Sequence, residues 1–210
     1  MKKLGLLLLP ILAITLIMGG SAFAQNVGDS TVYFVTYYSN ANVSGAPDGT
    51  LRLINDGDQA TEASEGVENG TLWADIYVFD DSQEMISCCS CYVSSDGLLS
   101  ESVNKELANN SLTFTGRAEV QRGVIKVISD RYLGNQESPT PLTGLRGWMT
   151  HIQATTNIPE KGPWFVTEAA LADSNLGSIE LTNLGTLCSY GLTIGSGYGT
   201  CPCTPEDYDF

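Results

Sequence analysis

Cysteines are the residues whose types and spacing point most directly to chemistry. Three lie in one short segment and three lie near the C-terminus: Cys88, Cys89, Cys91, Cys188, Cys201 and Cys203. In an oxidising compartment an even number of cysteines predicts disulfides. The alternative is a thiolate metal site, which the sulfur-rich CCSC and CPC segments would allow. The paired C-x-x-C spacing and nearby histidine of common zinc sites are missing, so disulfides are favoured.

The sequence by itself leaves the pairing of these cysteines open, because six cysteines allow about fifteen connectivities. A bond between the neighbours Cys88 and Cys89 would be strained, and on a strand their side chains point to opposite faces. Pro202 favours extended chain, which would place the cysteines on either side of it on one face. The grouping favours Cys88 with Cys188, and Cys89 and Cys91 with Cys201 and Cys203. Each loop of about 100 residues would then contribute roughly 4–5 kcal/mol.

No set of residues predicts catalysis. His151 is the only histidine, and no serine stands out as a nucleophile for it. On a strand we expect it to hydrogen-bond locally or to face solvent. The glycine-rich segment 195–199 has some likeness to a phosphate loop, but it lacks the preceding strand and following helix, so a tight turn is favoured. We therefore predict a protein that is not an enzyme and needs no cofactor.

Acidic side chains offer one possible metal site. Asp56, Asp58 and Glu62 could supply oxygen ligands to calcium, although the segment lacks the full spacing of a calcium loop and a plain turn is favoured. A further acidic group could provide a carboxylate pair for glycoside chemistry, but its members can just as easily be solvated turn or edge residues, so the sequence identifies no pair. These are Asp75, Asp80, Asp81 and Glu84.

Aromatic residues on the expected strands raise the possibility of a sugar-binding face. The set consists of Tyr33, Tyr37, Trp73, Tyr77 and Trp148. Aromatic side chains on strands more often belong to the core, which is the interpretation we favour.

The N-terminus has the features of an export signal. Lys2 and Lys3 precede the apolar run Leu4–Met18, and an A-x-A cleavage motif ends at Ala24. We predict a signal peptide over residues 1–24, a β-rich domain over 25–203 and an acidic tail over 204–210. The protein would be secreted, at the cell surface or periplasmic, with no stable membrane span after cleavage. With 24 acidic residues, ten basic ones and a net charge of −14, it should be repelled by nucleic acid and by anionic lipid.

A β-hairpin carries the first cysteine group. Its first strand, Leu72–Phe79, alternates between an aliphatic face and an aromatic face that includes Asp75. After a polar turn, the second strand is expected to place Met85 on the same face as Cys89, Cys91 and Val93. Ile86 would share the opposite face with Cys88 and Tyr92.

The rest of the chain predicts more strands and one helix. The expected strands are Thr31–Tyr38, Thr50–Ile54, Leu112–Thr115, Gly123–Ser129, Leu145–Thr156 and Trp164–Glu168, the last two paired across a turn near Pro159. A helix is expected at Ser178–Tyr190, with Ser178 as its cap, Gly191 at its end and an apolar stripe of Leu181, Leu184, Leu187 and Cys188. Ser94–Asn110 is ambiguous, although Ser102 could cap a short helix. Together these elements predict a mainly β fold: a single, disulfide-stapled, antiparallel β-sandwich-like domain with one short C-terminal helix.

Several segments resemble a group of small exported bacterial proteins of the acidobacterial type. They are ADIYVFDDSQEMISCCSCYVSSDGL, GVIKVIS, LRGWMTHIQ, LTNLGTLCSYG and GSGYGTC. The resemblance covers most of the mature chain, and its CC-x-C block is distinctive. It implies secretion and a shared cysteine framework but no activity. In that pattern a cysteine often stands where this chain has Trp73, which implies one disulfide fewer here.

Export, acidity and cysteines lead us to expect a non-enzymatic structural or adhesion protein. The strand Thr31–Tyr38 is apolar on both faces, which suggests pairing with a partner chain by self-association or with another extracellular protein. The alternative is an extracellular carbohydrate- or calcium-binding module with a glycan partner.

Overall fold

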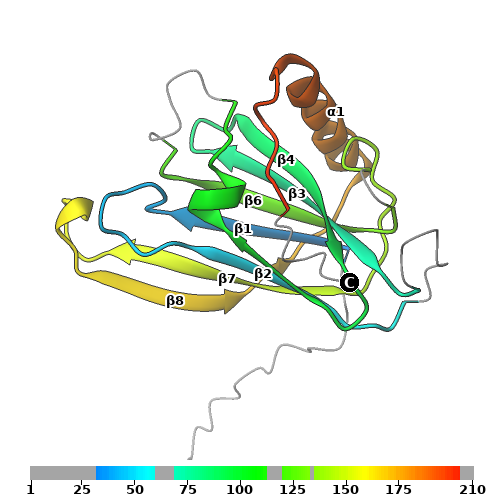
Figure 1. The fold of residues 1–210 in the computed structure, drawn as a ribbon, viewed down its shortest axis with the longest axis horizontal. Coiled ribbons are helices and arrows are strands. Elements are labelled where there is room, and N and C mark those ends of the chain that lie inside the picture. Colours follow the sequence, from blue (N-terminus) through cyan, green and yellow to red (C-terminus); the bar gives the residue numbers. More distant parts are fainter. Residues whose placement is uncertain (1–31, 60–68, 113–119, 133–134, 204–210) are drawn as a thin grey trace, which may run out of the picture.

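The computed structural model describes residues 32–59, 69–112, 120–132 and 135–203 of the chain. Two antiparallel sheets pack face to face, and a C-terminal helix covers the outer face of one of them (Figure 1). The prediction of a mainly β, sandwich-like fold with one short C-terminal helix and three cysteine pairs is confirmed.

The larger sheet has five strands in the order β4-β3-β6-β1-β9. Their bounds are β1 Tyr33–Ser39, β3 Leu72–Asp80, β4 Met85–Val93, β6 Arg122–Asp130 and β9 Ala172–Asp173. The predicted hairpin is its β3–β4 pair, and β3 also pairs with β6 along its length. β3 is therefore an interior strand, and all its residues but the last are buried.

The smaller sheet has four strands in the order β5-β2-β7-β8. Their bounds are β2 Thr50–Asn55, β5 Leu98–Ser102, β7 Leu145–Ala154 and β8 Trp164–Ala170. The predicted pairing of β7 with β8 is confirmed, and a 3-10 turn at Pro159–Lys161 lies between them. β5 occupies part of the segment that the sequence left ambiguous. It leads into a π-helical turn, Val103–Leu107, in which the Lys105 N–H donates to the Ser102 hydroxyl.

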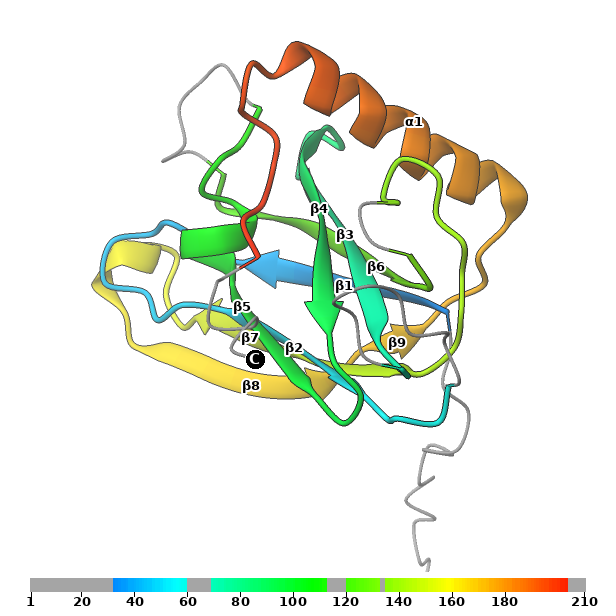
Figure 2. The same cartoon turned by 45° about the vertical axis from the view of Figure 1, so that its right-hand side comes forward.

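Helix α1 runs over Ser178–Ile194 and lies on the β3–β4 side of the larger sheet (Figure 2). The helix is confirmed, but three expected details are wrong. Its N-cap is Gly177 rather than Ser178, and it continues past Gly191 for another turn. Leu187 is 43% exposed, because the contact with the sheet is made through Leu184 and Cys188.

Two apolar clusters hold the layers together. The main cluster lies between the sheets and includes Leu51, Ile76, Ile86 and Met149. The second lies between α1 and the larger sheet, where Tyr77 is one of its fully buried members. The aliphatic and aromatic faces of β3 thus both become core, one against the other sheet and one beneath the helix.

A β-bulge overturns one prediction about the hairpin. Val78 pairs with Ser87, but the next residue, Phe79, pairs with Met85, so Ile86 is an extra residue in β4. Ile86 consequently packs between the sheets with Cys89, whereas Met85 lies on the helix side with Cys88. Simple alternation placed both residues on the wrong faces.

Strand β1 also differs from expectation. It was predicted as a strand that could pair with a partner chain, but it lies inside the sheet, bonded to β6 along its length and to β9 at Phe34 and Val35. Of the predicted strand Leu112–Thr115, only Leu112 is described, and it lies outside any strand. The predicted signal peptide (1–24) and acidic tail (204–210) lie outside the described residues.

Gly123 in β6 marks a close approach between two strands and the Tyr38 side chain. A Cβ atom at this position would lie 1.8 Å from the Phe79 carbonyl oxygen and 2.8 Å from the Tyr38 hydroxyl, which itself donates to that carbonyl. We expect Gly123→Ala to lower the free energy of unfolding by at least about 2 kcal/mol, because backbone must shift to accommodate the methyl group. Denaturant unfolding would measure this. Gly177→Ala is the matched control, since a Cβ there meets nothing, and an equal loss in both variants would contradict the prediction.

Candidate functional site

The hairpin cysteines form three disulfides with the C-terminal region. Cys88 bonds to Cys188 of α1, while Cys89 and Cys91 bond to Cys201 and Cys203. The Cα atoms of the three pairs lie 5.9, 5.3 and 5.4 Å apart, within the range that an unstrained disulfide spans. This is the connectivity that the grouping and the alternation of faces favoured.

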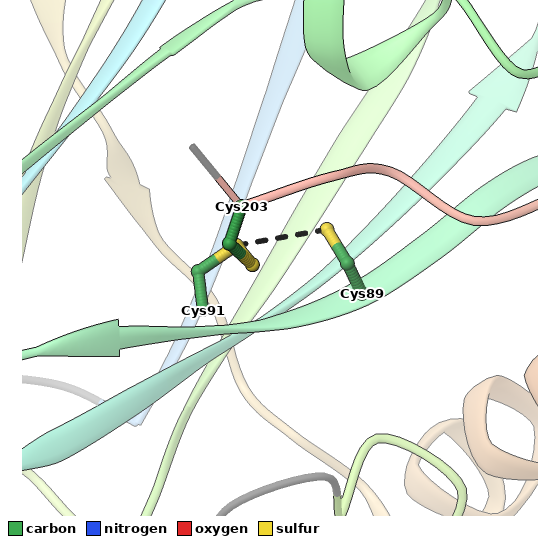
Figure 3. Close-up of side chains that lie close together, drawn as sticks. All are labelled: Cys89, Cys91 and Cys203. Carbon is green, nitrogen blue, oxygen red and sulfur yellow. Dashed lines mark hydrogen bonds between the residues drawn. A yellow bond between two sulfur atoms is a disulfide. The ribbon is translucent and has the colours of Figure 1, made fainter. Parts of the chain in front are cut away.

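Two of these disulfides lie side by side. The sulfurs of Cys89 and Cys91 are 3.8 Å apart, and the sulfur of Cys203 lies within 4.8 Å of both (Figure 3). Among the described residues this is the one cluster with the spacing of a metal site. Its sulfurs are engaged in disulfides and carry no thiolate charge, so in this oxidised form the cluster links the chain and does not offer ligands.

The next cluster is a pair of buried carboxyl groups on the helix side of the larger sheet. Asp75 of β3 and Asp130 of β6 are both fully buried. Asp130 accepts hydrogen bonds from the backbone N–H groups of Tyr132 and Thr140 at 3.2 and 3.0 Å and from the side chain of Asn135. Its carboxylate therefore organises the loop that follows β6.

Asp75 has a contrasting environment. No basic side chain or backbone N–H among the described residues bonds its oxygens. Burial, together with the neighbouring Asp130 and opposed by Ser90, raises the pKa of Asp75 to about 9. Asp75 is thus a neutral carboxylic acid at neutral pH. Of the alternatives that the sequence left open for Asp75, its burial excludes a solvated turn or edge position. Because neither acid is exposed, a substrate could not reach the pair.

Two other acids of that group have local structural roles, and the third, Glu84, is exposed. Asp80 accepts from the N–H groups of Ser82 and Glu84 and shapes the hairpin turn. Asp81 forms an exposed ion pair with Arg122 at 2.7 Å. Neither lies in a site that could bind a ligand.

The calcium candidate is only partly described. The Asp56 carboxylate lies 3.6 Å from Arg146 and caps the N–H of Asp58. Both interactions are those of a turn held by its own side chain. Glu62 lies outside the described residues, so the full set of candidate ligands is not brought together.

The aromatic set does not form a common face. Tyr33 and Tyr77 are buried beneath α1, and Trp73 packs edge-on against Tyr92 at 5.2 Å. Trp148 lies half-buried in the other sheet. The preference for a core role is supported for the three buried members, and the set offers no single surface to a sugar.

His151 is buried rather than solvent-facing. Its ring stacks on that of Tyr37, with centroids 4.1 Å apart, and it is 7% exposed. Burial lowers its pKa, opposed by a hydrogen bond to the Tyr37 backbone. The neutral ring serves to hold the end of β1 against β7, where the Asn40 amide also donates to the Ile152 carbonyl at 2.8 Å.

Strand β8 is the feature that sequence reasoning missed as a possible site. It is the last strand of its sheet, and its six residues from Phe165 to Ala170 are all exposed. Phe165 is 64% and Val166 is 53% exposed. In both views β8 lies on the opposite side of the molecule from α1 (Figures 1 and 2).

The hydrogen-bond pattern shows which backbone groups of β8 face outward. The flanking bonds to β7 are Thr155 N–H to the Pro163 carbonyl and Leu171 N–H to the Gly147 carbonyl, and the register between them is continuous. Since bonded and non-bonded pairs alternate in an antiparallel ladder, the odd-numbered residues of β8 bond to β7. The N–H and C=O groups of its even-numbered residues point to the open edge: Trp164, Val166, Glu168 and Ala170.

This edge lacks the devices that usually protect a terminal strand. Within Trp164–Ala170 there is no lysine, proline or bulge. Its one charge, Glu168, is neutralised by Arg52 at 2.5 Å. The edge of β4 in the other sheet is different, because the C-terminal segment bonds to Cys88 through Gly199 and Cys201. β8 is therefore prepared for strand addition in a way that β4 is not.

Within the described part of the chain, no helix has the length and apolar character needed to cross a membrane. Comparison of the chain with protein-family models, with curated proteins and with solved structures finds no match.

Proposed function

We propose that this chain is an exported, non-enzymatic interaction protein with a structural or adhesive role, and that it associates through strand addition at β8. The observation that carries the proposal is the open edge of β8, which is exposed, largely apolar and has its one charge, Glu168, paired with Arg52. Unpaired N–H and C=O groups on such an edge are a template for an incoming strand.

Two further features support the proposal that the protein is exported and acts outside the cell. The signal-like N-terminus predicts export, and three disulfides are typical of proteins in oxidising compartments. The resemblance to small exported bacterial proteins points the same way and remains a proposal.

A non-enzymatic role is supported by the positions of the groups that could catalyse. Asp75 and Asp130 are fully buried, and His151 nearly so. Among the described residues, none of these three side chains lines a cleft that a substrate could enter. The alternative, a carbohydrate- or calcium-binding module, has less support, because the aromatic set is dispersed and Asp56 pairs with Arg146.

Strand addition can be tested with a labelled peptide of sequence WFVTEAAL, which copies residues 164–171. We expect it to bind the disulfide-intact chain, measured by fluorescence anisotropy at low protein concentration. Val166→Lys should weaken binding by roughly tenfold or more, since a lysine protects an edge strand. Ile179→Lys on α1 is the matched control, because Ile179 is also an exposed β-branched residue. No binding to the unmodified chain, or equal binding by both variants, would contradict the proposal.

A further inference from the structure

We propose that the strand added to β8 is β8 of a second copy of this chain, antiparallel to the first and related to it by a two-fold axis at Thr167. The two four-stranded sheets would then form one continuous sheet across the dimer. This inference rests on the proposed function and names its partner.

The backbone of β8 favours this register. Residues Trp164, Val166, Glu168 and Ala170 present their N–H and C=O groups to the open edge. An axis at Thr167 sets Val166 opposite Glu168 of the second copy, and Trp164 opposite Ala170 of the second copy. Every outward group of the strand then has a partner, in directly opposed bonded pairs. An axis at Val166 or at Glu168 would leave one end of each strand without a partner.

Side-chain volume along β8 is complementary to itself. The first half of the strand is bulky, with Trp164, Phe165 and Val166, and the second half after Thr167 is smaller, ending in Ala169 and Ala170. In the antiparallel arrangement each bulky half faces the smaller half of the other copy. Phe165 would lie opposite Ala169 of the second copy, which would cover a ring that is 64% exposed in the single chain. A self-complementary patch of this kind is what a two-fold interface requires.

Charge selects the same register. The Glu168 carboxylate is paired with Arg52 of its own sheet, and an axis at Thr167 keeps the two Glu168 residues out of direct opposition. An axis at Glu168 would set these like charges against each other, which destabilises a cross-strand pair. The net charge of −14 per chain opposes association at long range, so the dimer should tighten as salt is added.

Covalent capture at Thr167 tests the register directly. Thr167 and its symmetry mate would form a non-bonded antiparallel pair, with Cα atoms about 4.5 Å apart, within reach of a disulfide. In the oxidised full chain, Thr167→Cys should therefore give a disulfide-linked dimer at least roughly tenfold faster than Thr182→Cys, an exposed position on α1. Equal rates for the two variants would overturn the proposed axis.

Sedimentation equilibrium tests the dimer without a new cysteine. The unmodified chain should form a dimer that tightens with salt. Val166→Pro should dissociate it by roughly tenfold or more, because it removes an outward N–H without touching a bond to β7. Ile179→Lys should leave the dimer intact, and far-UV circular dichroism would establish that both variants are folded.

The outcomes separate this inference from the proposed function. A chain that stays monomeric at all concentrations but binds the WFVTEAAL peptide would overturn the second copy as partner while leaving strand addition standing. A dimer that survives Val166→Pro would place the interface elsewhere and overturn the inference. Failure of both peptide binding and dimer formation would remove the proposed function as well.

Discussion

Replacing Cys88 and Cys188 together by alanine is expected to lower the free energy of unfolding by about 3 kcal/mol. The two residues are 100 positions apart, and a loop of that size alone would suggest nearly 5 kcal/mol. The three disulfides overlap along the chain, however, because each loop opens inside the one before it and closes beyond it. While Cys89 remains bonded to Cys201, the Cys88–Cys188 bond closes only a small additional loop in the unfolded chain. That loop runs from Cys188 to Cys201 and contains about 15 residues. The estimate of 4–5 kcal/mol for each bond, made from sequence spacing, is therefore too large when the other bonds remain.

The same variant should also loosen α1. The helix contacts the larger sheet through Leu184 and Cys188, which are its buried large side chains, while Ile179 and Tyr190 are more than half exposed. Without the bond, Leu184 and the contacts of Glu180 with Tyr33 and Lys126 are left to oppose fraying of the helix from the sheet. We expect faster amide hydrogen exchange along α1 and earlier cleavage there in limited proteolysis.

Cys91→Ala with Cys203→Ala is the matched control. Its bond spans 112 positions, but the adjacent Cys89–Cys201 bond already closes nearly the same loop, so the loss should be about 2 kcal/mol. Amide protection of α1 should stay unchanged in this control. Unaltered protection of α1 in the Cys88–Cys188 variant would show that the other contacts with the sheet hold the helix, contrary to our expectation.

Asp75→Asn is expected to change how stability depends on pH. The folded protein holds a proton on Asp75 up to about pH 9, whereas an aspartate in the unfolded chain loses it near pH 4. This raised pKa contributes stability fully below the unfolded value, and the contribution is lost as pH rises toward the folded value. Between these limits the slope is roughly −1.4 kcal/mol per pH unit.

Asparagine is neutral at every pH, so the variant should lose this slope. Its amide N–H can donate toward the Asp130 carboxyl group in place of the O–H of the protonated acid. Denaturant unfolding at pH 5 and pH 8 should show the variant gaining roughly 4 kcal/mol relative to the unmodified chain over that interval. Asp81→Asn is the control, because Asp81 sits in an exposed ion pair and its loss should change stability by less than about 1 kcal/mol. Parallel pH profiles for Asp75→Asn and the unmodified chain would contradict a protonated Asp75.

Most strands, the helix and the cysteine framework could be predicted from local pattern. Alternation in β3 and β4 sends neighbouring side chains to opposite faces, which is why Cys88 reaches α1 while Cys89 and Cys91 reach the C-terminal segment. The predicted strand Leu145–Thr156 is confirmed as strand β7, which ends at Ala154. These features depend on neighbours in the chain, where sequence reasoning is strongest.

The candidate site could not be predicted in the same way. Whether a strand ends a sheet depends on which other strands pair with it, and the apolar composition of β1 and β8 does not distinguish the two. From its composition, β1 would be the better candidate to pair with a partner chain, but it pairs with β6 and β9 within its own sheet. β8 instead ends its sheet and leaves one edge open.

The sequence by itself determined that this is a disulfide-stapled, mainly β chain, because side-chain alternation and the grouping of cysteines are local properties of the sequence. The tertiary structure alone decided the burial of Asp75 and His151, the bulge at Ile86 that reverses two side chains, and the open edge at β8. The buried side chains and the open edge depend on contacts between segments distant in sequence, whereas the bulge depends on how the two strands of the hairpin pair. Burial and strand order are properties of the assembled sheets, and no window of neighbouring residues contains them.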